Sequence, residues 1–239
     1  LRSLREKKHR KREGLFLAEG LRILAEALDS GRTPKILVVV EGTELHPLAQ
    51  KIEEATVAAG GDVIETSEAI IAKLSGKSNP QSIIGIYSDH PVELDELDRT
   101  AANIWLVAQA LRDPGNLGTI LRTGDAVGAG GLILIDDCVD PFSVEAVRAS
   151  MGAIFTQQIA QARWPEFLSW LRSGTGELVG TSLNTENDYQ SVHYKQPTFL
   201  LIGNEAQGLP EEYEAACDTL VKMPMMGKAD SLNAAVAAS

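Results

Sequence analysis

The sequence predicts an α/β fold in two parts, and three observations support this prediction. Short β-branched segments alternate with amphipathic helical patterns along the whole chain, as in layered α/β proteins. An acidic stretch at 89–99, with Pro91 and no large apolar cluster, interrupts this alternation and is typical of a linker or a short connecting helix. After it, three polar loops rich in Gly and Pro each follow an apolar strand. We therefore expect a small α/β domain over 1–90 and a larger domain over 98–239, built on a parallel sheet.

The first part is expected to be a compact βαβ-type unit. Its helices are predicted from apolar residues that recur on one face, and its strands from short β-branched runs. The expected helices cover 20–30, 48–59 and 68–74, and the expected strands cover 36–40, 63–65 and 83–87.

The second part alternates in the same way, so its strands are expected to pair in parallel. The expected strands cover 104–110, 132–135, 157–160, 178–180, 198–202 and 219–222; the expected helices cover 119–127, 144–151, 165–171 and 211–216. The glycines at 128–131 close a helix before a strand, where left-handed cap residues belong, so they are not a dinucleotide-binding loop. The chain is expected to stop inside a helix that begins at Ser231, with a C-terminal piece missing, and the absence of an initiator Met leaves open a start further upstream.

Composition excludes several classes of protein. With 239 residues, 44% hydrophobic and 23% charged, the chain matches an ordinary globular protein rather than a disordered or collagen-like one. Cys138 and Cys217 are too far apart for a zinc motif or a disulfide framework, which favours a reducing, cytoplasmic location. No apolar run approaches the roughly 20 residues of a membrane span. No metal site is expected either, because the histidines are scattered, at His9, His46, His90 and His193.

Charge is distributed unevenly. The net charge is -11, yet residues 1–12 hold seven Lys/Arg against Glu6 and carry +6, which leaves -17 on the rest of the chain. Attraction to a polyanion must therefore be local. The basic segment is either a solvated tail or an arm that contacts nucleic-acid phosphates, with Arg22, Arg112 and Arg148 as the other possible contacts.

The first two polar loops contain candidate site residues. In 112–123, a strand runs through a Pro/Gly turn into a helix, which places Asn116 and Arg122 near a ligand-binding sheet edge; the alternative is a simple tight turn. In 203–210, Gly203 and Gly208 permit close approach of a flat ligand such as adenine. Glu205 is the ionised group of this loop, and its alternative role is to accept hydrogen bonds from helix-start amides.

The third loop, within 221–235, follows a strand that ends at a Pro. Ser231 can cap a helix whose first turn carries Asn233. Met223, Met225 and Met226 are at this spacing more often core filler than ligand contacts. Three polar loops at one sheet edge are nevertheless harder to explain as structure alone.

Together, the segments DPGNLGTILRTGDAVGA, LLIGNEAQGLP and VKMPMMGKADSLNAAVA resemble the three ordered motifs of the SpoU (TrmH) family of RNA ribose 2′-O-methyltransferases, in the SPOUT superfamily. The likeness covers 104 to the end, and Arg148, Ser150 and Gly152 also fit it. The first ninety residues resemble the small substrate-binding domain that many members carry in front. Ala234 and Ala235 depart from the β-branched or Ser residues often seen there.

The resemblance implies a SPOUT domain with a deep C-terminal trefoil knot that holds S-adenosylmethionine, and a homodimer formed through this domain. It implies an RNA substrate, most often ribosomal RNA, with tRNA as the alternative. By the same resemblance, the catalytic group comprises Asn116, Arg122, Glu205, Ser231 and Asn233, and the cofactor site comprises Thr181, Gly203, Asn204, Gly208, Met223, Met225 and Leu232.

In the expected methyl transfer, the sulfonium of the cofactor becomes a neutral thioether, so the leaving group needs no acid catalyst. Only the nucleophile has to be activated. A ribose hydroxyl must be deprotonated or oriented in line with the methyl group. The resemblance implies that Arg122 gives this help. Since a guanidinium stays protonated, Arg122 either clamps a phosphate and stabilises alkoxide charge, or acts as a base only if strongly desolvated.

Three other functions compete with this one. A SPOUT enzyme that modifies a tRNA base would share the knot, but Asn116, Arg122 and the Ser231-Leu232-Asn233 run favour ribose. A noncatalytic RNA-binding protein would explain the front domain alone. An NAD-dependent enzyme is disfavoured by the position of the glycines at 128–131.

Overall fold

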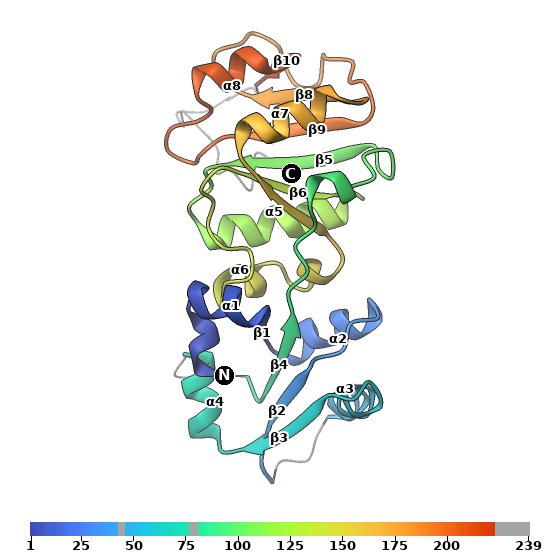
Figure 1. Ribbon diagram of the computed structural model, residues 1–239, viewed down its shortest axis with the longest axis vertical. Coiled ribbons are helices and arrows are strands. Elements are labelled where there is room, and N and C mark those ends of the chain that lie inside the picture. The colour runs from blue at the N-terminus through green and yellow to red at the C-terminus, as the bar shows by residue number, and fades with distance from the viewer. Residues whose placement is uncertain (43–45, 77–80, 223–239) are drawn as a thin grey trace. The chain divides into compact units, whose positions relative to one another are not determined.

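The computed structural model describes residues 1–42, 46–76 and 81–222. The chain forms two compact units (Figure 1). The first contains Leu1–His90 and Asp140–Thr156, and the second contains Pro91–Val139 with the described residues from Gln157 onward. The chain first passes from one unit to the other between His90 and Pro91, inside the predicted linker. No helix among the described residues is long and apolar enough to cross a membrane.

The first unit is built on a four-stranded sheet in the order β1-β4-β2-β3. Strands β2 and β3 pair in parallel around helix α3, as the βαβ prediction requires, while β4 runs antiparallel to β1 and β2. The elements are η1 (Arg2–Arg5), α1 (Lys7–Glu13), β1 (Leu15–Glu19), α2 (Leu21–Asp29), β2 (Ile36–Val40), α3 (Pro47–Ala58), β3 (Asp62–Thr66), α4 (Glu68–Ser75), β4 (Ile83–Ser88), α6 (Val144–Ala149) and η3 (Ala153–Phe155).

Sequence analysis did not anticipate strand β1 or the folding of the opening segment. The five residues of β1 pair with β4 along their whole length, and Phe16 and Leu17 are fully buried on opposite faces. Leu4 and Arg10 are also buried, so the basic segment is a folded part of this unit, and the solvated-tail interpretation is wrong. The apolar run at 15–18 was the available signal for β1, whereas the charged residues around Leu4 gave no sign that it is buried.

The second unit is a parallel sheet in the order β10-β8-β9-β5-β6-β7. Its parallel pairing confirms the predicted fold class. The elements are η2 (Leu94–Glu96), β5 (Ile104–Gln109), α5 (Pro114–Ala126), β6 (Gly131–Ile135), β7 (Gln158–Ala162), α7 (Trp164–Arg172), β8 (Glu177–Thr181), β9 (Thr198–Ile202), α8 (Glu211–Ala216) and β10 (Thr219–Val221). The predicted trefoil knot would involve 223–239, which lie outside the described residues.

Both faces of this sheet are covered, which explains why its strands are continuously apolar. Trp105 and Val107 of β5 belong to the same hydrophobic core as Phe167 of α7. Leu106 points to the other face, where an added Cβ on Gly124 of α5 would lie 3.0 Å from its Cδ1 atom. Helices α5 and α7 therefore pack on opposite faces of the sheet.

The segment Asp140–Thr156 leaves the second unit after β6, folds with the first unit, and returns to β7. Ring contacts bury Phe142 against Phe16 (5.1 Å between centroids) and Phe155 against Tyr87 (4.6 Å). The chain therefore passes three times between the units, although sequence analysis expected a single linker.

Two ion pairs fix this segment within the first unit. The guanidinium of Arg10, which is 4% exposed, donates to Asp140 Oδ2 at 2.6 and 3.0 Å. Arg148 donates to the buried carboxylate of Glu19 at 2.9 Å, and the backbone N–H of Gln81 donates to the same carboxylate. Burial raises the pKa of Glu19, but these donors outweigh it and hold the pKa below its ordinary value of 4.5.

This pKa gives a testable pH dependence. Because the pKa of Glu19 is lower in the folded state, its contribution to stability is present above about pH 4.5 and is lost as the pH falls through the folded value. Arg148→Ala leaves the buried carboxylate without its cation and should lower the free energy of unfolding at pH 7 by about 3 kcal/mol. Thermal melts of wild type, Arg148→Ala and Glu19→Gln between pH 3 and 8 test this. An acid-side slope in Glu19→Gln equal to that of wild type would contradict it.

Candidate functional site

The candidate site lies at the carboxyl ends of β5 and β9. These neighbouring strands pair in parallel, with Ala108 opposite Ile202, so the loops that follow them meet at one edge of the sheet (Figure 1). Ligands of open parallel α/β sheets bind at this edge. The first two polar loops of the sequence are thus brought together by strand order.

Helix α5 starts earlier than the sequence analysis predicted, at Pro114 rather than near Thr119. Asp113 is its N-cap, with a side chain that accepts a hydrogen bond from Asn116 N at 2.6 Å. Pro114 then occupies the first helical position, where its missing N–H costs nothing. The cap and the proline were visible in the sequence, and they place Asn116 in the first turn of a helix rather than in a loop.

Glu205 connects the two loops. Its carboxylate accepts hydrogen bonds from Arg112 N (3.3 Å), Asp113 N (3.2 Å) and Asn116 Nδ2 (3.3 Å), although Asn116 is 89 residues away in the sequence. A negative charge at a helix N-terminus is favourable. The role of accepting hydrogen bonds from helix-start amides is therefore confirmed, and the same carboxylate orients the side chain of Asn116.

The amide of Asn116 now has a defined orientation. Since Nδ2 donates to Glu205, Oδ1 is the atom that can accept a hydrogen bond from another group. Among the described residues Oδ1 has no such donor. An acceptor oxygen held at a ligand-binding edge is suited to a hydroxyl or a guanidinium.

Asn204 shapes the second loop. Its Nδ2 donates to Ala110 O at the end of β5 (2.8 Å), and its Oδ1 accepts from Ala206 N and Gln207 N. This side chain is fully used in holding the loop. Any contact it makes with a ligand would thus come from its backbone.

Gly203 closes the same loop. A Cβ at this position would lie 2.4 Å from the carbonyl carbon of Gly208 and 2.6 Å from Leu209 N. The loop backbone itself, rather than a ligand, fills the space beside Gly203. Gly208 has a φ of +69°, which favours glycine, and a Cβ there would meet no atom within 4 Å.

Thr181 lies on β8, the strand next to β9, and Arg122 lies on helix α5. Thr181 ends β8, and its Oγ1 donates to Leu201 O of β9 at 3.2 Å. Arg122 is exposed on α5, six residues after Asn116, which corresponds to about 240° of rotation around the helix axis. Within the described part of the chain, Arg122 makes no hydrogen bond to Asn116, so the two predicted catalytic groups present different faces of α5.

The remaining predicted site residues lie outside the described residues, and their roles stay predictions. They are the catalytic candidates Ser231 and Asn233 and the cofactor candidates Met223, Met225 and Leu232.

A polar group that is not among the predicted site residues lies at the end of the next strand, β6. Asp136, in a left-handed conformation with φ of 62°, accepts from Tyr213 Oη at 2.6 Å and from Trp164 N at 3.1 Å. Tyr213 stacks on Trp164 with 3.9 Å between ring centroids. Burial and the hydrogen bond to Asp136 both raise the pKa of Tyr213. An acidic residue directly after a predicted strand was the available signal.

These features define an open α/β protein with a candidate ligand site outside the carboxyl ends of a parallel sheet. Comparison with known proteins identifies its family. The SpoU rRNA Methylase family model matches residues 103–239, and the MRM3-like substrate binding domain model matches residues 1–85. The chain belongs to the SpoU rRNA methylase family, as its three motifs predicted.

Individual relatives are similar to this chain over nearly its full length. A 23S rRNA (uridine(2479)-2′-O)-methyltransferase of Streptomyces viridochromogenes is 32% identical over 96% of this chain and 82% of its own length. The 23S rRNA (guanosine(2553)-2′-O)-methyltransferase RlmP of Bacillus subtilis is 28% identical over 100% of this chain and 91% of its own length. An rRNA methyltransferase from Sinorhizobium meliloti, whose crystal structure has AdoMet bound, is 39% identical. The match covers 99% of this chain and 88% of that chain, with a TM-score of 0.91. This agreement confirms the predicted α/β fold with a front domain.

The closure of the second loop can be tested by adding one methyl group. Gly203→Ala forces the Cβ against loop backbone and should lower the free energy of unfolding by about 3 kcal/mol. Gly208→Ala, a matched change in the same loop, meets open space and should cost only its left-handed strain, about 1 kcal/mol. Equal losses in urea unfolding of the two variants would show that Gly203 does not close the loop.

Proposed function

We propose that this site transfers a methyl group from S-adenosylmethionine to a ribose 2′-hydroxyl of ribosomal RNA. The observation that carries the proposal is the contact of Asn116 with Glu205, which joins the first and second family motifs at the carboxyl edge of β5 and β9. The names of the relatives, which are 23S rRNA 2′-O-methyltransferases, support the substrate, and an AdoMet-bound neighbour supports the cofactor. A tRNA substrate is the alternative, and a noncatalytic RNA-binding role would leave this edge unused.

The residues at the sheet edge fit this cofactor. Thr181 and Gly203 lie at adjacent carboxyl ends of β8 and β9, where an adenosine group can reach backbone donors and acceptors. Thr181, Gly203, Asn204 and Gly208 would hold it, together with Met223, Met225 and Leu232. When bound, the cofactor supplies an electrophilic methyl group on sulfur.

The protein's own residues orient the nucleophile. Glu205 is a positioning residue, because it fixes Asn116 with Oδ1 available as an acceptor for a ribose hydroxyl. Arg122, exposed on α5, offers a guanidinium that can bind the adjacent phosphate and stabilise developing negative charge on the oxygen. Ser231 and Asn233 would complete the site from the third motif.

The proposal extends to assembly and location. We infer a homodimer through the methyltransferase domain 98–239, with 1–90 as the RNA substrate-binding domain. A C-terminal trefoil knot and a cytoplasmic location belong to the same proposal. Light scattering of the full chain distinguishes a dimer from a monomer.

Cofactor identity is tested by calorimetry on the full chain. S-adenosylmethionine should bind without a divalent metal ion, and NAD should give no heat. Binding of NAD alone, or binding that requires a metal, would overturn the cofactor assignment.

The roles of Asn116 and Arg122 are separated by kinetics. Asn116→Ala and Arg122→Ala should lower methyl transfer at least a hundredfold, the usual cost of losing a charge-stabilising group, with melting temperatures close to wild type. Arg122→Lys should also lose activity if the guanidinium makes a two-point phosphate contact. Labelled-methyl incorporation into large-subunit RNA, read as alkali-resistant positions, measures this. Near-normal turnover of Arg122→Ala would remove Arg122 from the mechanism.

A further inference from the structure

The basic opening segment is held rigidly on the first unit. Leu4 is 3% exposed in its core, and Arg10 donates to Leu4 O (2.8 Å) as well as to Asp140. Gly76, which ends α4, lies so close to the guanidinium of Arg5 that a Cβ there would be 2.2 Å away. The cations of η1 and α1 thus stand on a fixed backbone, and a partner that binds them pays little ordering entropy.

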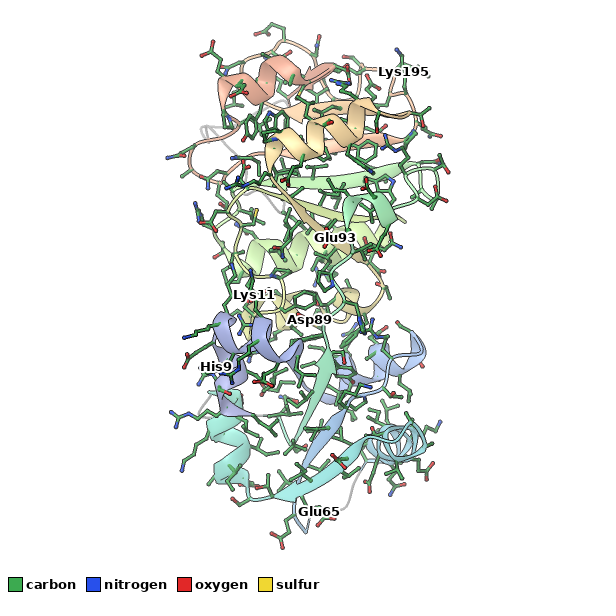
Figure 2. All side chains as sticks on the ribbon, in the orientation of Figure 1. His9, Lys11, Glu65, Asp89, Glu93 and Lys195 are labelled. Carbon is green, nitrogen blue, oxygen red and sulfur yellow. The ribbon has the colours of Figure 1, made fainter. Side chains whose placement is uncertain are left out.

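The structure sorts the seven cations of this segment by role. Arg10 is internal and paired, and Arg12 pairs at the surface with its neighbour Glu13 at 2.8 Å. The other five are exposed and form no ion pair with any described residue; they are Arg2, Arg5, Lys7, Lys8 and Lys11, the last labelled on α1 in Figure 2. We call these five residues the basic face.

The arrangement of the basic face is unfavourable for a helix alone. Lys7 and Lys11 are four residues apart, as are Lys8 and Arg12, so like charges stand next to each other on the surface of α1. Such pairs of like charges destabilise a helix. Charges of alternating sign would keep the surface equally soluble without this cost. Glu6, the N-cap of α1, faces His9 at 3.7 Å rather than these lysines.

An open cavity of about 550 Å³ adjoins the basic face. Its lining belongs to η1, to the turn that follows it and to the start of α6; the residues are Arg2, Ser3, Arg5, Glu6, Val144 and Glu145. The two arginines and Ser3 offer donors, while the two glutamates repel a second phosphate. This composition suits a single phosphate with its sugar at the end of a strand that runs along the lysines.

We propose that the basic face binds the phosphate backbone of the RNA substrate, with the strand along Lys7, Lys8 and Lys11 and one phosphate at Arg2 and Arg5. The proposal rests on the proposed function for the choice of RNA as the polyanion. Its physical basis is the charge contrast, since the first twelve residues carry +6 and the rest of the chain -17. A substrate repelled by most of the protein is captured where the unpaired positive charge is concentrated.

The salt dependence of RNA binding tests this proposal. Each phosphate contact to a single strand contributes about -0.7 to the slope of log affinity against log salt. The triple variant Lys7→Gln, Lys8→Gln, Lys11→Gln should therefore flatten the slope for deproteinised large-subunit RNA by about 2. Deletion of 1–12 is a poorer test, because it also removes the buried Leu4 and Arg10.

A matched control removes three exposed lysines elsewhere, with Lys35→Gln, Lys51→Gln and Lys195→Gln. Its salt slope should stay within about 0.5 of wild type, and both triple variants should bind S-adenosylmethionine as wild type does. Equal slopes in the basic-face variant and wild type, or an equal change in the control, would overturn the proposal. If wild type methylates no RNA, the proposed function fails instead, and the two failures are distinguishable.

Discussion

The hydrogen bonds between Glu205 and the start of α5 are the interaction on which the candidate site depends. They exist because β9 lies beside β5 in a parallel sheet, so that two loops distant in sequence leave the same edge. One carboxylate satisfies two backbone N–H groups that the helix cannot satisfy itself and also fixes the amide of Asn116. Structure and proposed chemistry therefore use the same side chain.

This arrangement changes how the glycines and amides of the second motif should be understood. Sequence reasoning assigned Gly203 and Gly208 to the approach of a flat ligand. The structure shows that Gly203 is needed by the loop itself, and that the side chain of Asn204 is consumed by the loop and by Ala110. These residues hold the shape of the edge, so any contact that Gly203 and Asn204 make with a cofactor would come from their backbone.

The first unit depends on a segment that the sequence places in the middle of the other half. Asp140–Thr156 supplies Phe142 and Phe155 to its aromatic cluster and Asp140 and Arg148 to its ion pairs. The SpoU rRNA Methylase family model spans this segment, so a boundary drawn from sequence at 90–98 follows the two family models but not the two compact units of the fold. Arg10 thus has a structural role within a segment whose other cations are at the surface.

The sequence alone determined most of the strands and helices and the family to which the chain belongs. The strands 36–40 and 198–202 and the helix 211–216 were predicted with the bounds that the structure has, because periodicity and turn residues are local signals. The start of α5 was also encoded locally, in Asp113 and Pro114, but was missed.

Only the tertiary structure decided the strand order, the pairing of β1 with β4, and the transfer of Asp140–Thr156 to the first unit. It also decided that Glu205 contacts Asn116, that Arg10 is buried, and that Asp136 anchors Tyr213. Each of these depends on partners tens of residues apart, and the choice among such partners is made by packing and hydrogen-bond satisfaction in the folded chain, which no local pattern records.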